Sequence, residues 1–406
     1  MKKSIAYIEK SSCTGCGLCA EKCPQGCISM QPDAEGFLAP VVNDTACIDC
    51  GLCLKFCPTG KAADTLYHQE EQKYFCAISS DTDTLLKSSS GGLFGILSNT
   101  VLQNGGYVCG CIYNEQMEAV HIITDDPDVV LHMYGSKYVQ SHAFPCFSRI
   151  KDLLEGGKTI LFTGTACQIA ACRLYLDKEY NNIYFVEILC HGVPSPAFFA
   201  AYVRHLKKKL GGRVLDLQFR NKEKHGWGSE HRTCVIYEKK GKIKKHRPFL
   251  PAYFSTFFYG MNLRESCYRC RFADKKRIAD LTIGDFWGAW AKYGKRFDEG
   301  ISVAAANTEK GKTLAAQIQD ASTMFEELTQ SEAARSNDNF EHPIPRPRER
   351  SSFYTGQVLS HYRGIWKKAY LSRTYRKKTL ASLYGATVPA KIRFALQRMK
   401  TKKRKQ

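Results

Sequence analysis

The middle of the chain alternates between two hydrophobic patterns. Apolar residues recur at every third or fourth position in residues 147–157, 165–176 and 196–212, and this spacing predicts helices that bury one face. Residues 158–164 and 182–190 are short apolar runs with the length of buried strands. Because strands that alternate with helices favour a βαβ arrangement, we predict a mostly parallel sheet covered by helices.

Shorter patterns lie on both sides of this region. Residues 107–114 and 118–124 flank a polar turn and predict a hairpin. Residues 214–219 and 233–238 predict two late strands, which we expect to join the sheet as an antiparallel addition.

A polar segment is expected to lead into one further helix. Residues 79–87 are mostly polar and predict a connector. The serines from Ser88 would cap the helix, which is expected to begin near Leu93 and to end at Gly105.

Composition is that of a globular protein, with 44% hydrophobic and 24% charged residues in 406 positions. This length exceeds what one core usually holds, so we expect two or three domains. The first residues contain no apolar run of the length that a signal peptide needs, and no later run is long enough for a membrane span. We therefore expect a cytoplasmic protein.

Positive charge is concentrated at the end of the chain. The formal net charge is +20, and residues 343–406 contain eighteen Lys and Arg against one acidic residue, Glu349. This tail opens with a proline-rich linker, and residues 391–406 place apolar side chains on one helical face among cations. We expect the tail to contact an anionic membrane surface. Because the tail accounts for most of the charge, no nucleic-acid partner is expected.

Eight of the nineteen cysteines form two copies of the motif CxxCxxCxxxCP. Thiols stay reduced in the cytoplasm, so metal or redox chemistry is favoured over disulfides. The motif is typical of bacterial 4Fe-4S ligation, in which three thiolates hold one cluster and the fourth reaches the other cluster. We therefore predict two 4Fe-4S clusters, one held by Cys13, Cys16, Cys19 and Cys57 and the other by Cys47, Cys50, Cys53 and Cys23.

The alternative for these runs is zinc, which usually takes two CxxC pairs rather than triplets. A reduced structural arrangement of cysteines is a second alternative. Gly15, Gly17 and Gly51 would allow backbone amides to approach the cluster sulfides. Cys27 falls outside the motif and is expected only to pack.

Four further cysteines lie where predicted strands end or loops begin. Cys167 and Cys190 follow successive strands, and Cys267 and Cys270 form the pair CYRC. The carboxyl ends of parallel strands share one rim of a sheet, so these four thiols are candidates for a third 4Fe-4S cluster. The alternatives are that Cys167 and Cys190 are small buried side chains, and that CYRC is half of a zinc site or a dithiol.

Two segments have the residue types of an anion site. The SSSGG sequence in residues 88–92 opens a helix whose free amides favour an anion such as a flavin pyrophosphate, although a serine cap gives the same pattern. Lys137 in GSKYVQS either pairs with a phosphate or faces solvent. The chain has neither a GxGxxG fingerprint nor a P-loop motif, so a flavin would have to be held in another way.

Together these motifs resemble those of a known family. The chain is similar to the coenzyme F-420 hydrogenase/dehydrogenase beta-subunit family over about residues 13–307, in the double cysteine run and in SSSGGLF, GSKYVQS, LFTGTACQIA, CHGVPSP and CYRCRFADKKRIADLTIGDFWG. The resemblance implies an iron–sulfur flavoprotein that binds FAD and exchanges electrons with a two-electron acceptor. The family includes subunits that reduce coenzyme F-420, chlorophyll-pathway reductases and bacterial relatives linked to surface polysaccharide synthesis.

The resemblance also implies roles for particular residues. The four dispersed cysteines match positions expected to hold the family's cluster. Ala166 stands where the family usually has proline, which is expected to loosen the loop before Gln168. No catalytic residue is assigned. His191 is a candidate proton donor, although a ring bound to a backbone carbonyl is the alternative, and Asp285 is a candidate cofactor ligand or loop cap. The implied flavin site consists of Ser88, Ser89, Ser90, Gly91, Gly92, Lys137, Tyr138, Thr163 and Gly164.

The predicted fold class is α+β / α/β multidomain. We expect a small two-cluster bacterial-ferredoxin-like domain in residues 1–75, a mixed sheet domain with flanking helices in two parts, 76–145 and 146–340, and a basic C-terminal tail in residues 341–406. We predict an oxidoreductase with a small-molecule substrate and a redox partner, either a ferredoxin or another subunit. The alternatives are an electron-transfer subunit without its own substrate, a reductase associated with polysaccharide biosynthesis, and an anion-binding protein with structural clusters.

Overall fold

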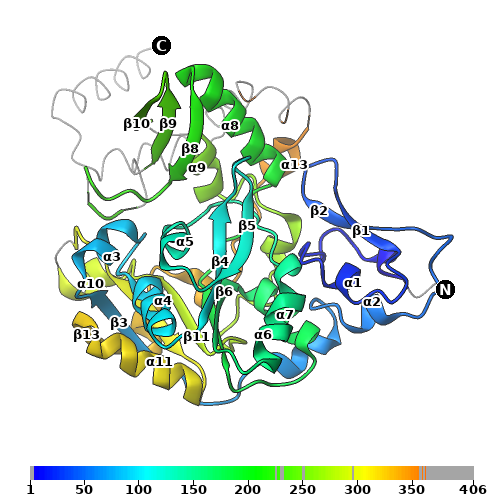
Figure 1. The fold of residues 1–406 in the computed structure, drawn as a ribbon, viewed down its shortest axis with the longest axis horizontal. Helices are drawn as coiled ribbons and strands as arrows, with labels where there is room; N and C mark the ends of the chain where they lie inside the picture. Colours follow the sequence, from blue (N-terminus) through cyan, green and yellow to red (C-terminus); the bar gives the residue numbers. More distant parts are fainter. Residues whose placement is uncertain are drawn as a thin grey trace, which may run out of the picture.

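The computed structural model describes residues 4–224, 226–228, 233–248, 252–294 and 297–355, together with residues 359 and 362. It consists of a small N-terminal section and a larger body, and the small section projects to the right of the body in Figure 1. The amphipathic segment predicted in residues 391–406 lies outside the described residues. In the described part, no helix has both the length and the apolar character needed to cross a membrane.

Both cysteine runs of the small section fold in the same way. Each run continues into a short helix that begins directly after a glycine, Gly17 or Gly51, with a left-handed φ of 79° or 75°. Residues with a side chain rarely adopt this conformation. The sequence duplication is therefore also a structural duplication. The elements of this section are η1 (Ile5–Tyr7), α1 (Leu18–Glu21), the antiparallel strands β1 (Ile28–Pro32) and β2 (Leu38–Val42), α2 (Leu52–Lys55) and η2 (Lys61–Leu66).

The body is built on one eight-stranded sheet with the order β13-β3-β12-β11-β7-β6-β4-β5. Strands β4, β6, β7 and β11 are parallel, and the other strands run antiparallel to their neighbours. The predicted parallel core and the predicted hairpin are confirmed. The strands are β3 (Lys73–Ser79), β4 (Tyr107–Tyr113), β5 (Ala119–Thr124), β6 (Ile160–Thr165), β7 (Ile183–Ile188), β11 (Leu281–Asp285), β12 (Ser302–Ala306) and β13 (Ser322–Leu328).

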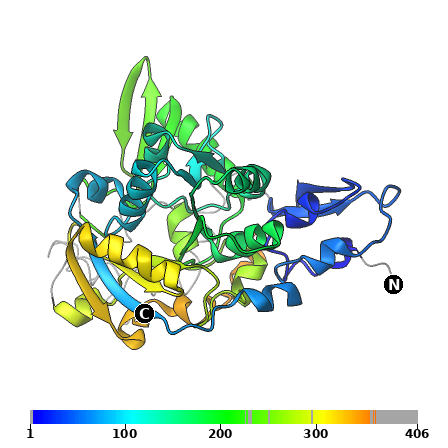
Figure 2. The ribbon, with the colours of Figure 1, turned by 60° about the horizontal axis from the view of Figure 1, so that its bottom comes forward.

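Helices cover both faces of this sheet, as the turned view in Figure 2 shows. On one face, Leu97 of α4 and Leu314 of α11 share a core with Leu161. On the other face, Ile169 of α7 shares a core with Phe162 and with residues of α6. Leu161 and Phe162 belong to different layers because successive side chains of a strand point to opposite faces. The bounds of these helices are α4 (Leu93–Gln103), α6 (Phe147–Glu155), α7 (Ala166–Leu176) and α11 (Glu309–Asp320).

A smaller unit of the body holds the two predicted late strands. They form a separate antiparallel sheet in the order β10-β9-β8, so the prediction that they extend the large sheet is wrong. Two helices complete this unit around a core that includes Phe198, Phe219 and Tyr253. The elements are α8 (Pro196–Leu210), β8 (Arg213–Gln218), β9 (Cys234–Lys239), β10 (Lys242–His246) and α9 (Ala252–Phe258).

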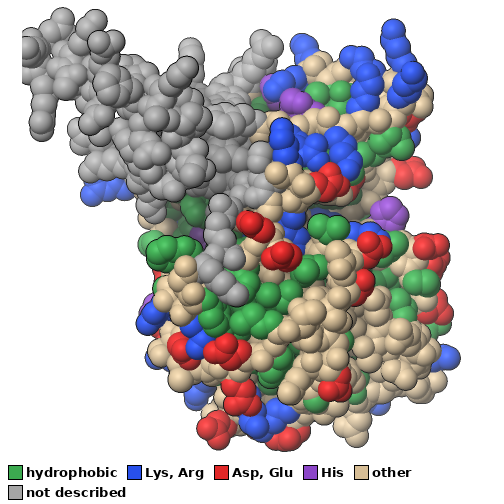
Figure 3. Space-filling view, turned by 90° about the vertical axis from the view of Figure 1, so that its left-hand side faces the viewer, with side chains coloured by type: hydrophobic (Ala, Val, Ile, Leu, Met, Phe, Trp, Pro, Cys, Tyr) green, Lys and Arg blue, Asp and Glu red, His purple; other side chains and the backbone are tan. Residues whose placement is uncertain are grey.

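This smaller unit is also strongly basic. Residues 204–247 contain fifteen Lys and Arg against four Asp and Glu. Figure 3 shows Lys and Arg side chains gathered at the top of the molecule, over this unit. The positive charge is therefore not confined to the tail.

Two local predictions near Ser88 are wrong. The polar segment in residues 79–87 is not only a connector, because α3 (Thr82–Lys87) forms there with Asp81 as its N-cap. Helix α4 has Gly92 as its N-cap, with φ of 89° and no side-chain cap, so the serines do not cap it. Its expected end is confirmed, since the helix stops before Gly105, where φ is 70°.

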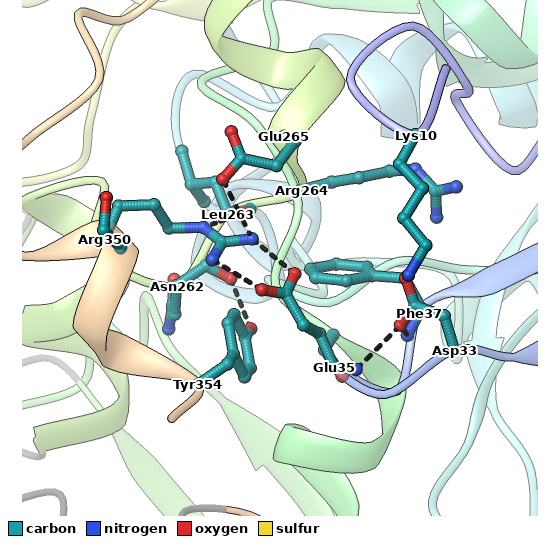
Figure 4. A network of polar contacts seen from close by, with 12 residues as sticks. Lys10, Asp33, Glu35, Phe37, Asn262, Leu263, Arg264, Glu265, Arg350 and Tyr354 are labelled. Atoms are coloured by element: carbon teal, nitrogen blue, oxygen red, sulfur yellow. Dashed lines mark hydrogen bonds and ion pairs between the residues drawn. The ribbon is translucent and has the colours of Figure 1, made fainter. Parts of the chain in front are cut away.

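The first residues of the predicted tail pack against the body. Arg350 is 1% exposed, and its guanidinium donates two hydrogen bonds to Glu35 of the small section, at 2.9 and 2.6 Å (Figure 4). It also donates to the backbone oxygen of Leu263 at 2.8 Å. Residues 343–355 thus join the body to the small section. The remaining short helices of the body are α5 (Pro127–Leu131), η3 (Phe144–Cys146), η4 (Glu265–Arg269), α10 (Ala289–Tyr293), α12 (Gln330–Ala334), η5 (Asp338–Phe340) and α13 (Arg350–Phe353).

Candidate functional site

The first group of thiols is formed by the first cysteine run and the last cysteine of the second run. Burial is the main reason that the pKa of the Cys16 thiol rises to about 12, and the neighbouring thiols of Cys57 and Cys13 raise it further. Burial also raises the pKa of Cys19, which is affected by the same three cysteines. The fold therefore brings Cys57 to the first run, as the motif predicts. We call Cys13, Cys16, Cys19 and Cys57 the first thiol group.

The second group lies at the outer part of the small section. One small cavity is lined by Cys47, Cys50, Cys53 and Cys23, which we call the second thiol group. Cys50 is exposed, so this group is open to the surface. Cys27 is buried and lines the same cavity, and its sulfur lies 3.4 Å from the sulfur of Cys23.

A large cavity of about 1490 Å³ lies in the body beside the small section. Its wall includes the four dispersed cysteines, most of the residues of the implied flavin site, and the loop Thr14–Cys16 of the first thiol group. Ligand cavities usually have volumes of about 300–1,000 Å³. This cavity therefore has room for more than one small molecule.

The four dispersed cysteines converge on this cavity from three segments. Cys167 lies at the start of α7, Cys190 follows β7, and Cys267 and Cys270 lie at η4. Burial raises the pKa of Cys190 well above its usual value, and the thiols of Cys267, Cys167 and Cys270 add to this effect. Burial likewise raises the pKa of Cys167 to about 12. These four residues are the third thiol group.

All three groups have the crowding expected of cluster ligands rather than of ligands to one ion. In the described part of the chain, no three His, Cys, Asp or Glu side chains could together hold a single metal ion. A 4Fe-4S cluster is larger than one ion and is held by thiolates that stand around it. The amide of Gly192 donates to the sulfur of Cys190 at 3.3 Å, and hydrogen bonds of this kind tune the potentials of such clusters.

The serine segment forms one wall of the cavity at the start of α4. Ser89 accepts a hydrogen bond from the amide of Ser136 at 2.8 Å, and Ser90 donates to the carbonyl of Ile301 at 2.7 Å. Ser88, Ser89, Ser90 and Gly92 line the cavity. Gly91 is not on its wall, because the Gly91 amide donates to Ser302 and a Cβ there would lie 2.3 Å from the carbonyl oxygen of Ala77.

The remaining residues of the implied flavin site also line the cavity. Lys137 donates to the carbonyls of His132 and Tyr134, at 2.6 and 2.8 Å, so its ammonium is not simply in solvent. Burial lowers its pKa. Tyr138 accepts a hydrogen bond from Arg220 at 3.2 Å. Thr163 and Gly164, at the end of β6, complete the wall.

The turn after β6 is fixed despite its alanine. Ala166 is the first residue of α7, and Thr165 and Gln168 form a capping box around it. The amide of Thr165 donates to the Gln168 side chain at 3.0 Å. The expectation that Ala166 loosens this loop is therefore wrong, because the capping box supplies the restraint that a proline would give.

Neither candidate for catalysis has a free functional group. Asp285 accepts two hydrogen bonds from Arg220, both at 3.1 Å, and a third from the indole of Trp227 at 3.0 Å. The ring nitrogens of His191 lie 3.4 Å from the Asn339 side chain and 3.2 Å from the carbonyl of Phe258. Both residues line the cavity, and both act there as parts of polar networks.

Sequence reasoning missed three features of the cavity wall. His121 is buried with Nε2 3.0 Å from the carbonyl of Thr163, and Arg220 stacks on Trp287 with 4.9 Å between its guanidinium carbon and the ring centroid. Residues 343–349 also line the cavity. His121 lies in an ordinary alternating strand pattern, and residues 343–349 have the composition of a linker, so neither carries a local signal.

The cavity wall fits a phosphate-bearing cofactor such as FAD. Among the described residues, the buried atoms Ser88 Oγ and His121 Nδ1 have no hydrogen-bond partner, and both residues line the cavity. Native proteins rarely leave such atoms unpaired, so a bound group is expected to pair with them. Helix α4 has no side-chain cap at its start, where free amides favour an anion.

Comparisons with known proteins agree with the two kinds of site. Residues 157–331 match the family model for the C terminus of the coenzyme F420 hydrogenase/dehydrogenase beta subunit, and residues 12–61 match the model of a 4Fe-4S dicluster domain. A chain from the F420-reducing NiFe hydrogenase complex of Methanosarcina barkeri is similar, with 18% sequence identity and a TM-score of 0.42. That alignment covers 67% of this chain and 90% of the other. A search of curated proteins found no match.

Proposed function

Residues 157–331 belong to the coenzyme F420 hydrogenase/dehydrogenase beta-subunit family and residues 12–61 form a 4Fe-4S dicluster domain, and from this premise we propose that the chain is an iron–sulfur flavoprotein oxidoreductase. Its coarser class, an iron–sulfur electron-transfer protein, follows from the two matched segments. The finer proposal is that the chain binds three 4Fe-4S clusters and FAD and that it acts on an organic molecule.

One observation carries the proposal. A single cavity is lined by the third thiol group, by the serine segment at the start of α4 and by the loop Thr14–Cys16 of the first thiol group. Sites for a cluster and for a flavin would therefore share one wall. Bound clusters would supply one-electron transfer, and bound FAD would supply its conversion to two-electron chemistry on a substrate.

The residues of the chain have distinct parts in this proposal. The first, second and third thiol groups hold the clusters, and the uncapped start of α4 with Ser88 and His121 binds the flavin. The exposed Cys50 places the second group where a redox protein can approach, and the first group lies between it and the cavity. The thiol groups thus form a series from the surface to the cavity.

A second candidate is an electron-transfer subunit without its own substrate. The matched family is described as a beta subunit, which favours a partner subunit. The volume of the cavity supports the enzyme, because it leaves space beside a flavin for a substrate. The two are separated by testing whether the purified chain alone oxidises or reduces small molecules, or does so only after a partner is added.

The cofactors are tested by anaerobic purification with analysis of iron, sulfide and flavin. We expect about twelve irons per chain, four from each thiol group, and one FAD. Cys167→Ala should lower the iron content by about four. Cys172→Ala on the same helix is the matched control, because Cys172 is buried away from the cavity, and its iron content should stay at the wild-type value.

Three results would contradict parts of the proposal. An iron content of about eight in the wild type, unchanged by Cys167→Ala, would remove the cluster from the third thiol group. Iron without flavin would remove the FAD and favour the electron-transfer subunit. A folded, colourless protein without iron would refute the proposal as a whole.

A further inference from the structure

Arg264 is buried where the small section meets the body, with 5% of its surface exposed. Its guanidinium donates hydrogen bonds to the backbone oxygens of Cys13, at 2.6 Å, and of Leu38, at 2.9 Å, both in the small section. It also donates to the side-chain oxygen of Gln140 in the body at 3.2 Å. One cation therefore links the loop of the first thiol group to the wall of the large cavity.

Arg264 has no carboxylate to balance its charge. Among the described residues it forms no ion pair, and the two carboxylates of the network in Figure 4, Glu35 and Glu265, bind Arg350 and Arg346 instead. A guanidinium stays protonated in proteins, and a buried charge without a counter-ion is strongly unfavourable. The folded protein therefore needs an anion near Arg264.

Thiol groups lie on both sides of this cation. Nη2 of Arg264 is 3.5 Å from the sulfur of Cys13, and the backbone oxygen of Arg264 accepts a hydrogen bond from the amide of Cys267 at 3.0 Å. Although burial raises the pKa of both Cys167 and Cys267, the charge of Arg264 acts on each in the opposite direction. A cluster held by four thiolates would be the missing anion, because its net charge is negative.

We propose that Arg264 is a positioning residue that supplies a positive charge shared by the first and third thiol groups. The inference rests on the proposed function, since it requires clusters in these groups. The charge would stabilise the reduced, more negative form of each adjacent cluster and so raise its reduction potential. The hydrogen bonds of the same side chain hold the loop of Cys13 against the loop of Cys267.

Gly15 shows how closely the loop approaches Arg264. A Cβ at this position would lie 2.7 Å from Nη1 of Arg264 and 2.9 Å from Nε2 of Gln140, and the φ of Gly15 is 68°. The amide of Gln140 donates to the carbonyl of Thr14 at 2.9 Å, which fixes the loop from the other side. Any side chain at residue 15 would move the loop away from the cation.

Arg271 provides a matched control on the other side of Cys267 and Cys270. Its guanidinium donates to the carbonyl of Gly60 at 2.6 Å, so it also docks the body on the small section. Unlike Arg264, it forms an ion pair with a carboxylate, that of Asp64. Arg271 therefore docks the two parts without contributing an unbalanced charge.

The test is a redox titration of the full chain, followed by the electron paramagnetic resonance of each reduced cluster. In Arg264→Gln, the ratio of reduced to oxidised cluster should fall about tenfold at a given potential for the cluster at Cys13, a shift of about 59 mV for one electron. Arg264→Lys keeps the charge and should shift the potential less. Arg271→Gln should leave the potential unchanged.

Two results would overturn the proposal: wild-type potentials in Arg264→Gln, or equal shifts in Arg264→Gln and Arg271→Gln. If Arg264→Gln does not retain iron, Gly15→Ala is titrated instead, since it keeps the arginine but displaces the loop, and an unchanged potential there contradicts the proposal. A wild type with about eight irons would refute the third cluster alone, because the cluster at Cys13 would still report the effect of Arg264.

Discussion

At the scale of single residues, the surroundings of the thiols divide the cysteines into two kinds. Twelve of them lie in the three thiol groups, whereas others, such as Cys172 and Cys234, are buried singly in apolar cores. Motif spacing was sufficient to predict the first two groups, because their ligands are close in sequence. Cys27 was predicted only to pack, and its contact with Cys23 could not be inferred because it lies outside the motif.

His121 should make the stability of the protein depend on pH. Burial lowers its pKa to about 4 in the folded chain, whereas histidine in an unfolded chain takes up a proton near pH 6.5. Between these values the unfolded state binds more protons, so the free energy of unfolding falls as the pH is lowered. Between pH 6.5 and 4.5 we expect His121 to contribute about 2 kcal/mol to this fall.

Equilibrium unfolding at pH 6.5 and pH 4.5 measures this contribution. His121→Gln, which cannot take up a proton, should lose about 2 kcal/mol less than the wild type over this interval. His132→Gln replaces an exposed histidine and should behave as the wild type does. Equal losses in His121→Gln and the wild type, at matched iron content, would show that the ring does not titrate as described.

At the scale of elements, the sequence was informative where a segment folds on a local pattern. Helices α6, α7 and α8 and strands β6 and β7 were predicted because their apolar spacing repeats within each segment. Strand β12 was not predicted, because Ser302–Ala306 is buried on both faces and consists mainly of alanine, which has little strand preference. Strand β3 was missed because its partners, β12 and β13, lie more than 200 residues away.

The β1–β2 hairpin docks on the start of α8 through Gly36. A Cβ at this position would lie 2.2 Å from the Cβ of Ala197 and 2.8 Å from Oγ of Ser195, and φ is 78°. Gly36→Ala should therefore lower the free energy of unfolding by more than the roughly 1–2 kcal/mol that the left-handed conformation alone costs a residue with a side chain.

Gly26→Ala is the matched control for this substitution. Gly26 also has a positive φ, 56°, and lies in the small section, but nothing lies within 4 Å of a Cβ placed there. It should show only the conformational cost. Unfolding curves and the rate of proteolysis between the small section and the body would measure the difference. Equal effects of the two substitutions would rule out the contact with α8 as a source of stability.

At the scale of the whole molecule, contacts between distant segments hold the small section in place. Arg350 binds Glu35, Arg264 binds Cys13 and Arg271 binds Gly60, and each pair is separated by more than 200 residues. Sequence reasoning could not predict these pairs, because each arginine looks like any other cation in a basic chain. The joining of the two parts, unlike the cysteine motifs, therefore required the structure.

The ion pair between Glu35 and Arg350 should be important for stability. Glu35→Ala would leave the buried guanidinium of Arg350 without its bidentate partner. Loss of one partner of a fully buried pair costs about 3–5 kcal/mol, and we expect about 2 kcal/mol here because Glu35 is partly exposed and Glu265 stays 3.6 Å from Arg350. Denaturant unfolding gives this value directly.

The neighbouring pair of Lys10 and Asp33, also drawn in Figure 4, is the control. Its nitrogen and oxygen are 3.6 Å apart and the lysine side chain is 72% exposed, so Lys10→Ala should cost less than about 1 kcal/mol. A similar loss of stability in both variants would mean that burial of Arg350 does not set the strength of its ion pair.

The bond between Glu35 and Arg350 also sets an order for biosynthesis. These residues are 315 positions apart, so at about 5–20 residues per second the ribosome needs roughly 16 to 63 s to add the second after the first. During that interval the small section has left the ribosome, but the contact that fastens it to the body cannot yet form. Cluster-assembly proteins therefore have access to the N-terminal cysteines before the finished chain closes over the first group.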